Sequence, residues 1–245
     1  MEVLILCHLF VGIALGLVLY LLLIRNKWIV FAVAFGSVLP DLVDKPLGHL
    51  IMNESLDNGR LLFHGLMVVG IILVVALALR RTRYSVLFAG LALGMISHQL
   101  LDAMWLDPVA WFFPLMGPYV PAHYPDFFVH GLWAELTSPT EWIFLFVSAS
   151  LIIPFTVWRW GWVTPEWKER LGWAARWVLR AGPWLLSIAG IIILVQTSLS
   201  TFQNVEDMTE SVVLGVVCLM GAIFLVYWDR KVMSRGRSMI AQLTR

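Results

Sequence analysis

Long uninterrupted apolar runs constrain this chain more than any other feature of its sequence. The first run extends over residues 3–24, and His8 is its one side chain that ionises near neutral pH. About 20 apolar residues are enough for a helix to cross a hydrocarbon core roughly 30 Å thick. The composition agrees, because 60% of the 245 residues are hydrophobic and only 13% are charged, whereas soluble domains carry about 25% charged residues. We therefore predict an all-α, polytopic integral membrane protein.

Seven segments are apolar enough to be candidate transmembrane helices: residues 3–24, 28–40, 61–79, 85–104, 141–158, 183–201 and 211–228. The second segment is short for a full span. We expect it to continue through the turn at 41–46 or to lie in a protein-lined region. No basic residue precedes the first segment, and a basic cluster beginning at Arg25 follows it, so we expect it to be retained as a span rather than cleaved as a signal peptide.

The distribution of Lys and Arg predicts the orientation in the membrane. If the N-terminus lies outside, all but two of the 17 basic residues fall on the cytoplasmic side, the exceptions being Lys45 and Arg60. Cytoplasmic loops of membrane proteins carry an excess of Lys and Arg. The pattern therefore predicts seven transmembrane helices with the N-terminus outside and the C-terminus in the cytoplasm.

We expect a single membrane domain with two parts. Residues 1–140 carry the ionisable groups within the spans and end in an external segment, about 105–140, which is either a lid over a substrate groove or a packed connector. Residues 141–245 supply supporting helices. They include a Trp- and Arg-rich amphipathic segment, about 159–182, of the kind that lies at the cytoplasmic membrane surface.

Charge and cysteine content argue against nucleic-acid binding and against a CxxC metal site. A formal net charge of +1 gives no electrostatic footprint for nucleic acid. Cys7 and Cys218 both lie within apolar runs and form no CxxC motif, so we interpret them as small hydrophobic residues.

Ionisable side chains within or beside membrane spans are costly and commonly functional. Six histidines and aspartates of the first four predicted helices fall at the external side: His8, Asp41, Asp44, His64, His98 and Asp102. His98 and Asp102 are four residues apart and share a helix face. Imidazoles and carboxylates together suit a borderline divalent cation. We predict a site for one or two such ions, zinc first, with manganese and iron as alternatives.

Each residue of this set has a structural alternative when it is taken alone. His8 in a span can be an interhelical hydrogen-bonding group, and Asp41 in a Pro-Asp pair can cap a turn. Four segments that bring His and Asp to one depth favour the metal site. We expect His8, His64, His98 and Asp102 to be ligands, together with one of the two other aspartates.

The motifs that carry these residues resemble a known family. His8, GSVLPDLVDKP, FHG at His64, and GMISHQLLDAMW followed by FFPLMGP are similar to the membrane-bound metal-dependent hydrolases, which include bacterial inner-membrane members under LexA control. The order His, PDxxD, His, HxxxD also resembles the first half of the ligand set in zinc-dependent phospholipases C. The resemblance covers roughly residues 1–120. The chain departs from it at GRLLFHG, where family members commonly carry an HRGxTHS-like segment, and it lacks the phospholipase HxxxE pair.

The resemblance implies a prokaryotic plasma-membrane hydrolase that acts on phosphate esters. A metal-bound site at the outer headgroup level suits a lipid or another amphiphile as substrate, with metal-activated water as the nucleophile. We expect Asp41 or Asp44 to be the general base or to orient a histidine, and Glu141 to be a candidate for proton transfer. His49 is expected to be a solvated loop residue. The alternatives are a metal-ion or proton-coupled transporter and a ceramidase-like seven-helix amidase.

Overall fold

The structure is a computed structural model that describes residues 5–121, 126–160, 164–202 and 204–230. Every regular element in these ranges is helical, which confirms the all-α class. The elements are α1 (Ile5–Leu22), α2 (Trp28–Gly36), α3 (Leu39–Pro46), η1 (Leu47–Ile51), α4 (Leu66–Ala78), α5 (Ser85–Leu101), η2 (Met104–Leu106), α6 (Pro108–Trp111), α7 (Phe127–Thr137), α8 (Pro139–Trp160), α9 (Pro165–Leu199) and α10 (Val205–Trp228).

Four of these helices are long and apolar enough to cross a membrane: Ile5–Leu22, Pro139–Thr156 within α8, Pro165–Leu199 and Val205–Trp228. Large apolar side chains also remain exposed along them, among them Ile188 and Ile223. Such a surface matches lipid rather than water. The helices α4 and α5 are apolar but shorter, and at 1.5 Å per residue they measure about 20 and 26 Å. The prediction of an integral membrane protein is confirmed, and the count of seven spans and their orientation stay predictions.

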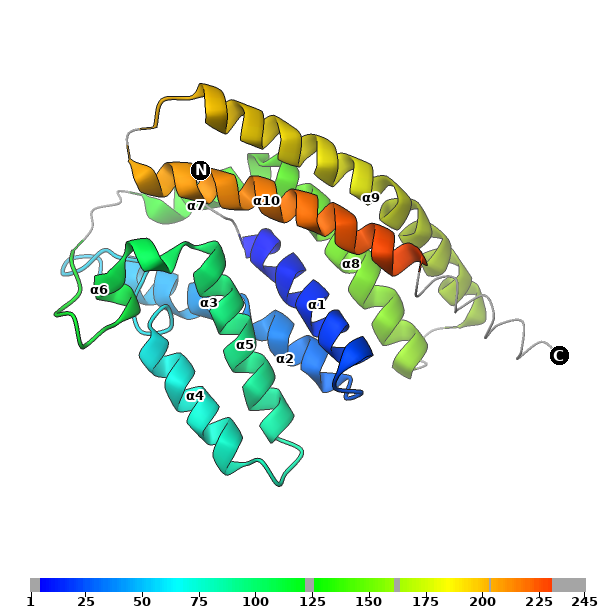
Figure 1. The fold of residues 1–245 in the computed structure, drawn as a ribbon, viewed down its shortest axis with the longest axis horizontal. Coiled ribbons are helices and arrows are strands. Elements are labelled where there is room, and N and C mark those ends of the chain that lie inside the picture. The colour runs from blue at the N-terminus through cyan, green and yellow to red at the C-terminus, as the bar shows by residue number, and fades with distance from the viewer. Residues whose placement is uncertain (1–4, 122–125, 161–163, 203, 231–245) are drawn as a thin grey trace.

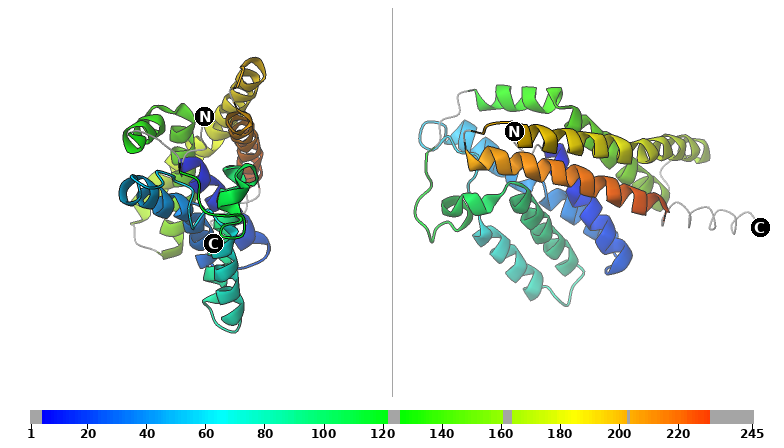
Figure 2. Two further views of the ribbon diagram at one scale, coloured as in Figure 1. Left: turned by 90° about the vertical axis from the view of Figure 1, so that its left-hand side faces the viewer. Right: turned by 45° about the horizontal axis from the view of Figure 1, so that its top comes forward.

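Helix α1 lies at the centre of the molecule, where it packs against α2, α5 and α8 (Figure 1). The long helices α9 and α10 run side by side on one flank, and the α4–α5 hairpin projects on the other (Figures 1 and 2). The main core contains side chains of both halves of the chain, such as Phe10, Phe144 and Leu186. Helices α3, α6 and α7 gather at one end of this bundle (Figure 1).

Helices α2 and α5 approach so closely that backbone touches backbone. A Cβ atom added at Gly36 would lie 2.2 Å from the carbonyl oxygen of Leu91, and one added at Gly94 would lie 2.2 Å from that of Val33. Side chains at either position would force the helices apart. The two glycines therefore bring the C-terminal end of α2 next to the last turns of α5, where His98 lies.

The structure differs from the sequence prediction at the amphipathic segment. Residues 165–182 do not form a separate surface helix, because they continue without a break into the predicted span at 183–201. Together they make the 35-residue helix α9, which contains Pro183 in its interior. Residues 161–163, at the start of the predicted segment, lie outside the described part of the chain, as do residues 122–125 of the external segment.

Candidate metal centre

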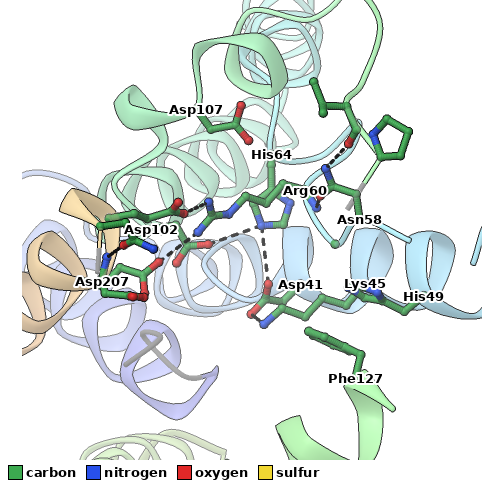
Figure 3. Close-up of a pocket in the computed structure, with 16 residues that line it drawn as sticks. Asp41, Lys45, His49, Asn58, Arg60, His64, Asp102, Asp107, Phe127 and Asp207 are labelled. Carbon is green, nitrogen blue, oxygen red and sulfur yellow. Dashed lines mark hydrogen bonds and ion pairs between the residues drawn. The ribbon is translucent and has the colours of Figure 1, made fainter. Parts of the chain in front are cut away.

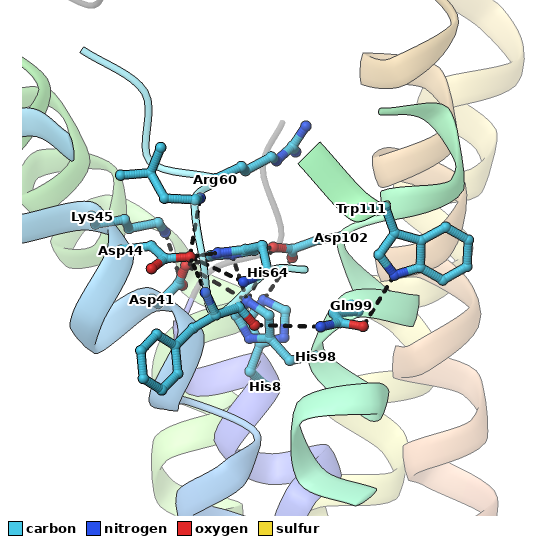
Figure 4. A network of polar contacts seen from close by, with 12 residues as sticks. His8, Asp41, Asp44, Lys45, Arg60, His64, His98, Gln99, Asp102 and Trp111 are labelled. Carbon is cyan, nitrogen blue, oxygen red and sulfur yellow. Dashed lines mark hydrogen bonds and ion pairs between the residues drawn. The ribbon is translucent and has the colours of Figure 1, made fainter. Parts of the chain in front are cut away.

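Four buried side chains from three segments of the chain form a compact group (Figure 4). Their ligand atoms all lie within 4.8 Å of one another, and the four residues are Asp41, His64, His98 and Asp102. Asp41 lies in the first turn of α3, and His64 lies in the loop before α4. His98 lies in the last turn of α5, whose C-cap is Asp102. The structure thus brings together four of the six predicted ligands.

The two histidines of the group point the same ring nitrogen at each other. Nδ1 of His64 lies 2.8 Å from Oδ2 of Asp44, and Nδ1 of His98 lies 2.8 Å from the carbonyl oxygen of Ser37. Both acceptors require a proton on Nδ1, so in the neutral rings Nε2 carries the lone pair. The two Nε2 atoms lie only 3.1 Å apart. Two facing lone pairs repel, so this arrangement requires a positive charge between them, either a proton or a metal ion.

The two carboxylates complete a shell of the size that a metal ion needs. Oδ2 of Asp102 lies 3.2 Å from Nε2 of His98 and 3.5 Å from Nε2 of His64. Oδ1 of Asp41 lies 3.6 and 3.7 Å from the same two nitrogens. Ligand bonds of about 2.0–2.1 Å in a tetrahedron place ligand atoms roughly 3.3 Å apart. Oδ1 of Asp41 is also buried without a hydrogen-bond partner, whereas its Oδ2 accepts from Lys45 at 2.8 Å. The residues present therefore fit a divalent cation.

Asp44 lies behind the group rather than in it. Its Oδ2 accepts hydrogen bonds from the backbone N–H groups of Leu61, Phe63 and His64 at 2.9–3.0 Å, in addition to the ring of His64. A single carboxylate oxygen thereby shapes the loop and fixes the tautomer of His64. Of the two roles expected for Asp41 or Asp44, general base or partner that orients a histidine, Asp44 has the second. Partners of this kind orient metal-binding imidazoles in many metalloproteins.

His8 lies beside the group and is fully buried. Its ring stacks on that of His98 with the centroids 4.0 Å apart. Its Nε2 lies 3.0 Å from Oδ1 of Asp102, the carboxylate oxygen opposite the one nearest His98. Neither ring nitrogen of His8 makes a hydrogen bond of good geometry among the described residues. The structure therefore places this predicted ligand outside the four-residue group, next to the carboxylate of Asp102.

The structure gives Glu141 a local role at the start of α1. Its buried Oε2 accepts from the backbone N–H groups of Leu6 at 2.8 Å and Cys7 at 3.3 Å. Glu135 accepts from the N–H of Ile5 in the same way. Carboxylates at a helix N-terminus satisfy N–H groups that have no partner within the helix. The carboxylate of Glu141 thus caps α1 instead of joining the group around His64.

A cavity of about 300 Å³ borders the group and includes Asp41, His64 and Asp102 in its wall (Figure 3). Among the described residues, six carboxylates line it, three of them on α10, together with two permanent cations. The charged residues are Asp41, Asp102, Asp107, Glu206, Asp207, Glu210, Lys45 and Arg60. The wall is therefore strongly acidic, and the second half of the chain supplies part of it.

His49 in the cavity wall was not identified as a functional candidate by the sequence, and the expectation of a solvated residue is wrong. It is buried, Nδ1 lies 2.8 Å from Oδ1 of Asp57, and Phe127 stacks on its ring at 3.7 Å. The backbone of Asp57 has φ +41°, an uncommon conformation for a non-glycine residue. The sequence did carry one signal, since Asp41, Lys45 and His49 recur every four residues and therefore share one helix face.

Arg60 is the second residue of the wall that sequence reasoning left without a role. Nη1 of its guanidinium is ion-paired with Glu206, and Nη2 lies 3.0 Å from Oε1 of Glu210. Burial alone lowers the pKa of this guanidinium, but the carboxylates of Asp102, Glu206 and Glu210 outweigh burial and raise the pKa above its ordinary value. Arg60 is therefore a fixed positive charge in an acidic cavity.

Comparisons with known proteins place the chain in a family. The sequence model of one family, described as YdjM inner membrane protein, matches residues 3–230, nearly the whole chain. No curated protein and no solved structure matches the chain.

Proposed function

This chain belongs to the YdjM inner membrane protein family, and we propose that this membrane protein is a membrane-embedded, metal-dependent hydrolase. The substrate is a phosphate ester of a lipid or another amphiphile, and the site faces the extracytoplasmic leaflet. The observation that carries the proposal is the 3.1 Å separation of the Nε2 atoms of His64 and His98, with both Nδ1 atoms engaged elsewhere. Two buried imidazoles held in this way are built to share a cation.

The proposed chemistry divides between the cation and the side chains around it. A divalent ion such as zinc would lower the pKa of a water molecule and polarise a phosphoryl oxygen, provided that it accepts a further ligand beside the four protein side chains. Asp41, His64, His98 and Asp102 would hold it, and Asp44 and Ser37 would keep the two imidazoles in the required tautomer.

Only one of the three carboxylates predicted to be catalytic borders the cavity. Asp41 lines it, whereas the described lining includes neither Asp44 nor Glu141. Both of the latter accept hydrogen bonds from backbone N–H groups. Of the three carboxylates, Asp41 therefore acts at the cavity as a metal ligand, and Asp44 acts through His64.

An amphiphilic substrate is supported by the surface beside the cavity. Val120 and Pro121 line the cavity, and the loop that leads to them exposes apolar side chains, with Leu115 86% and Met116 54% exposed. Exposed apolar patches of this kind mark membrane or ligand contacts. The extracytoplasmic orientation rests on the sorting of Lys and Arg.

The proposal is tested by elemental analysis of the detergent-purified, full-length protein. We expect one or two equivalents of zinc in the unaltered protein and none in the double variant His98→Ala, Asp102→Ala. The exposed His130 of α7 provides the control, since His130→Ala should keep the metal. The absence of stoichiometric metal, or its retention in the double variant, contradicts the proposal.

A second measurement separates the reaction types. The zinc-loaded protein is incubated with phospholipid and isoprenoid phosphate in mixed micelles, and we expect release of the water-soluble phosphate product. Release of fatty acid from an N-acyl lipid instead would indicate the amidase. Zinc uptake into sealed liposomes without any hydrolysis would indicate the transporter.

A further inference from the structure

Arg60 lies in the cavity wall between the candidate metal ligands and α10 (Figure 3). It belongs to the loop between η1 and α4, four residues before His64. Its own backbone N–H donates to Oδ1 of Asn58 at 2.8 Å. The loop that places His64 in the metal group therefore also fixes the position of this arginine.

Two glutamates of α10 hold the guanidinium from one side. Glu206 and Glu210 are four residues apart on one helix face, and each pairs with a different terminal nitrogen of Arg60. A guanidinium has five N–H donors in one plane, so these two contacts leave donors for another partner. The side chain of Arg60 keeps 24% of its surface exposed although it is ion-paired twice. The two ion pairs thus orient the guanidinium and leave part of its surface exposed.

We propose that Arg60 binds the phosphoryl group of the substrate. This inference rests on the proposed function, because it takes the neighbouring residues to hold a divalent cation. A planar guanidinium binds two oxygens of a phosphate at once, which an ammonium cannot do. The substrate is then a phosphate ester, not a carboxylic ester or an amide.

The charge distribution of the cavity gives the reason for an arginine at this place. Four carboxylates of the wall lie outside the candidate metal ligands and repel an anion: Asp107, Glu206, Asp207 and Glu210. Lys45, the other permanent cation among the described wall residues, has its ammonium 2.8 Å from Asp41, a candidate metal ligand. Arg60 is paired with glutamates outside the metal group, so its charge can be directed at the substrate. A neutral ester or amide would need no such fixed charge.

The competing interpretation is that Arg60 only ties the loop to α10. A pure tie predicts that Arg60→Gln lowers thermal stability and leaves anion affinity unchanged. Phosphate binding by Arg60 predicts that Arg60→Gln weakens anion affinity. It also predicts that Glu206→Gln raises the affinity a few-fold where Arg60 is present and by less when it is combined with Arg60→Gln, because the anion then lies at the guanidinium that Glu206 pairs with.

The experiment uses the full-length, zinc-loaded protein in detergent and isothermal titration calorimetry. The probes are inorganic phosphate and dioctanoyl phosphatidic acid in mixed micelles. We expect Arg60→Gln to weaken binding of both probes at least tenfold with its zinc content unchanged, and Arg60→Lys to fall between. The control is Arg83→Gln in the exposed turn between α4 and α5, which should bind both probes as the unaltered protein does.

The outcomes separate this inference from the function on which it rests. A protein without zinc contradicts the proposed function. A zinc-loaded protein that binds neither probe, or whose Arg60→Gln variant binds them unchanged, overturns the role of Arg60 alone. If Arg60→Gln does not fold, Arg60→Lys decides, since weaker binding of both probes supports the role of Arg60 and unchanged binding overturns it. Tighter binding of phosphatidic acid assigns the site to a lipid headgroup, and equal binding assigns it to a water-soluble phosphate.

Discussion

Nδ1 of His98 donates to the carbonyl oxygen of Ser37 at 2.8 Å, across 61 residues of sequence. Ser37 directly follows α2, and His98 lies in the last turn of α5. The orientation of this imidazole therefore depends on how closely the two helices pack. We therefore expect metal binding to depend on how these helices pack, and both can be measured.

Gly94→Ala tests that coupling, because the new Cβ atom would lie 2.2 Å from the carbonyl oxygen of Val33. Overpacking of this kind costs about 1–3 kcal/mol of unfolding free energy. We expect a lower melting temperature in detergent and weaker zinc binding by calorimetry. Gly70→Ala in α4 is the matched control, since nothing lies within 4 Å of its Cβ position. If Gly94→Ala behaves like Gly70→Ala, the packing of α2 on α5 does not position His98.

Asp44→Asn tests the residue behind His64. The amide keeps the shape of the side chain but lacks the charge of the carboxylate. Its oxygen can still accept from the backbone of the loop. Loss of such an orienting partner typically weakens metal binding 10- to 100-fold, and we expect that range by competition with a fluorescent chelator. Glu54→Gln, an exposed acid in the preceding turn, should have no effect. An unchanged zinc affinity in Asp44→Asn would contradict the role given to Asp44.

Removal of the metal should destabilise the protein, because the four candidate ligands join α3, the following loop and α5. A ligand that binds only the folded state adds about 2.7 kcal/mol when its concentration is 100 times its dissociation constant. We therefore expect the melting temperature to fall on chelation and to recover when zinc is added back. The same titration on His98→Ala should give no recovery. Equal shifts in the two proteins would show that zinc acts elsewhere.

Variants of Glu141 test whether this residue caps α1 or takes part in catalysis. Glu141→Ala would leave the half-buried N–H group of Leu6 and the buried N–H group of Cys7 without their acceptor, at a cost of about 1–3 kcal/mol. We expect a lower melting temperature with zinc content maintained, and a milder loss in Glu141→Gln, which keeps an acceptor oxygen. If both variants melt normally and lose hydrolysis instead, the proton-transfer role predicted from the sequence holds and the cap is unimportant.

The orientation can be tested with single cysteines and a membrane-impermeant maleimide. The native Cys7 and Cys218 are buried and should not react. We expect Leu115→Cys, at a position 86% exposed, to be labelled in intact cells. Arg83→Cys, in the exposed turn between α4 and α5, should be labelled only after lysis. The reverse pattern would turn the cavity toward the cytoplasm, and labelling of both in intact cells would refute the predicted order of spans.

The sequence was sufficient for the helical class and for most of the metal group. Apolar runs and four-residue spacing are local properties, so His98 and Asp102 could be paired from spacing alone. The shared depth of His64 and Asp41 followed from the sorting of basic residues. These inferences need no knowledge of how the helices pack.

What the sequence could not provide depends on contacts between distant segments. Glu141 caps α1 across more than 130 residues, and no local pattern indicates that contact. Asp44 and Asp41 look equivalent in PDLVD, yet only the folded loop directs three backbone N–H groups at Asp44. The wall contributed by α10 was missed for the same reason. Residues 141–245 do more than support the site, since Glu206 and Glu210 belong to its cavity.

The length of α9 has a consequence for where the lipid ends. Its 35 residues measure about 52 Å. Even at a steep tilt of about 40°, a hydrocarbon core of roughly 30 Å encloses only about 39 Å of such a helix. At least two turns must therefore protrude from the bilayer as a stiff rod, and exposed tryptophans such as Trp173 and Trp177 lie toward the end that begins at Pro165. Because α9 has no break, the thickness of the host membrane decides which of these rings lie among the headgroups.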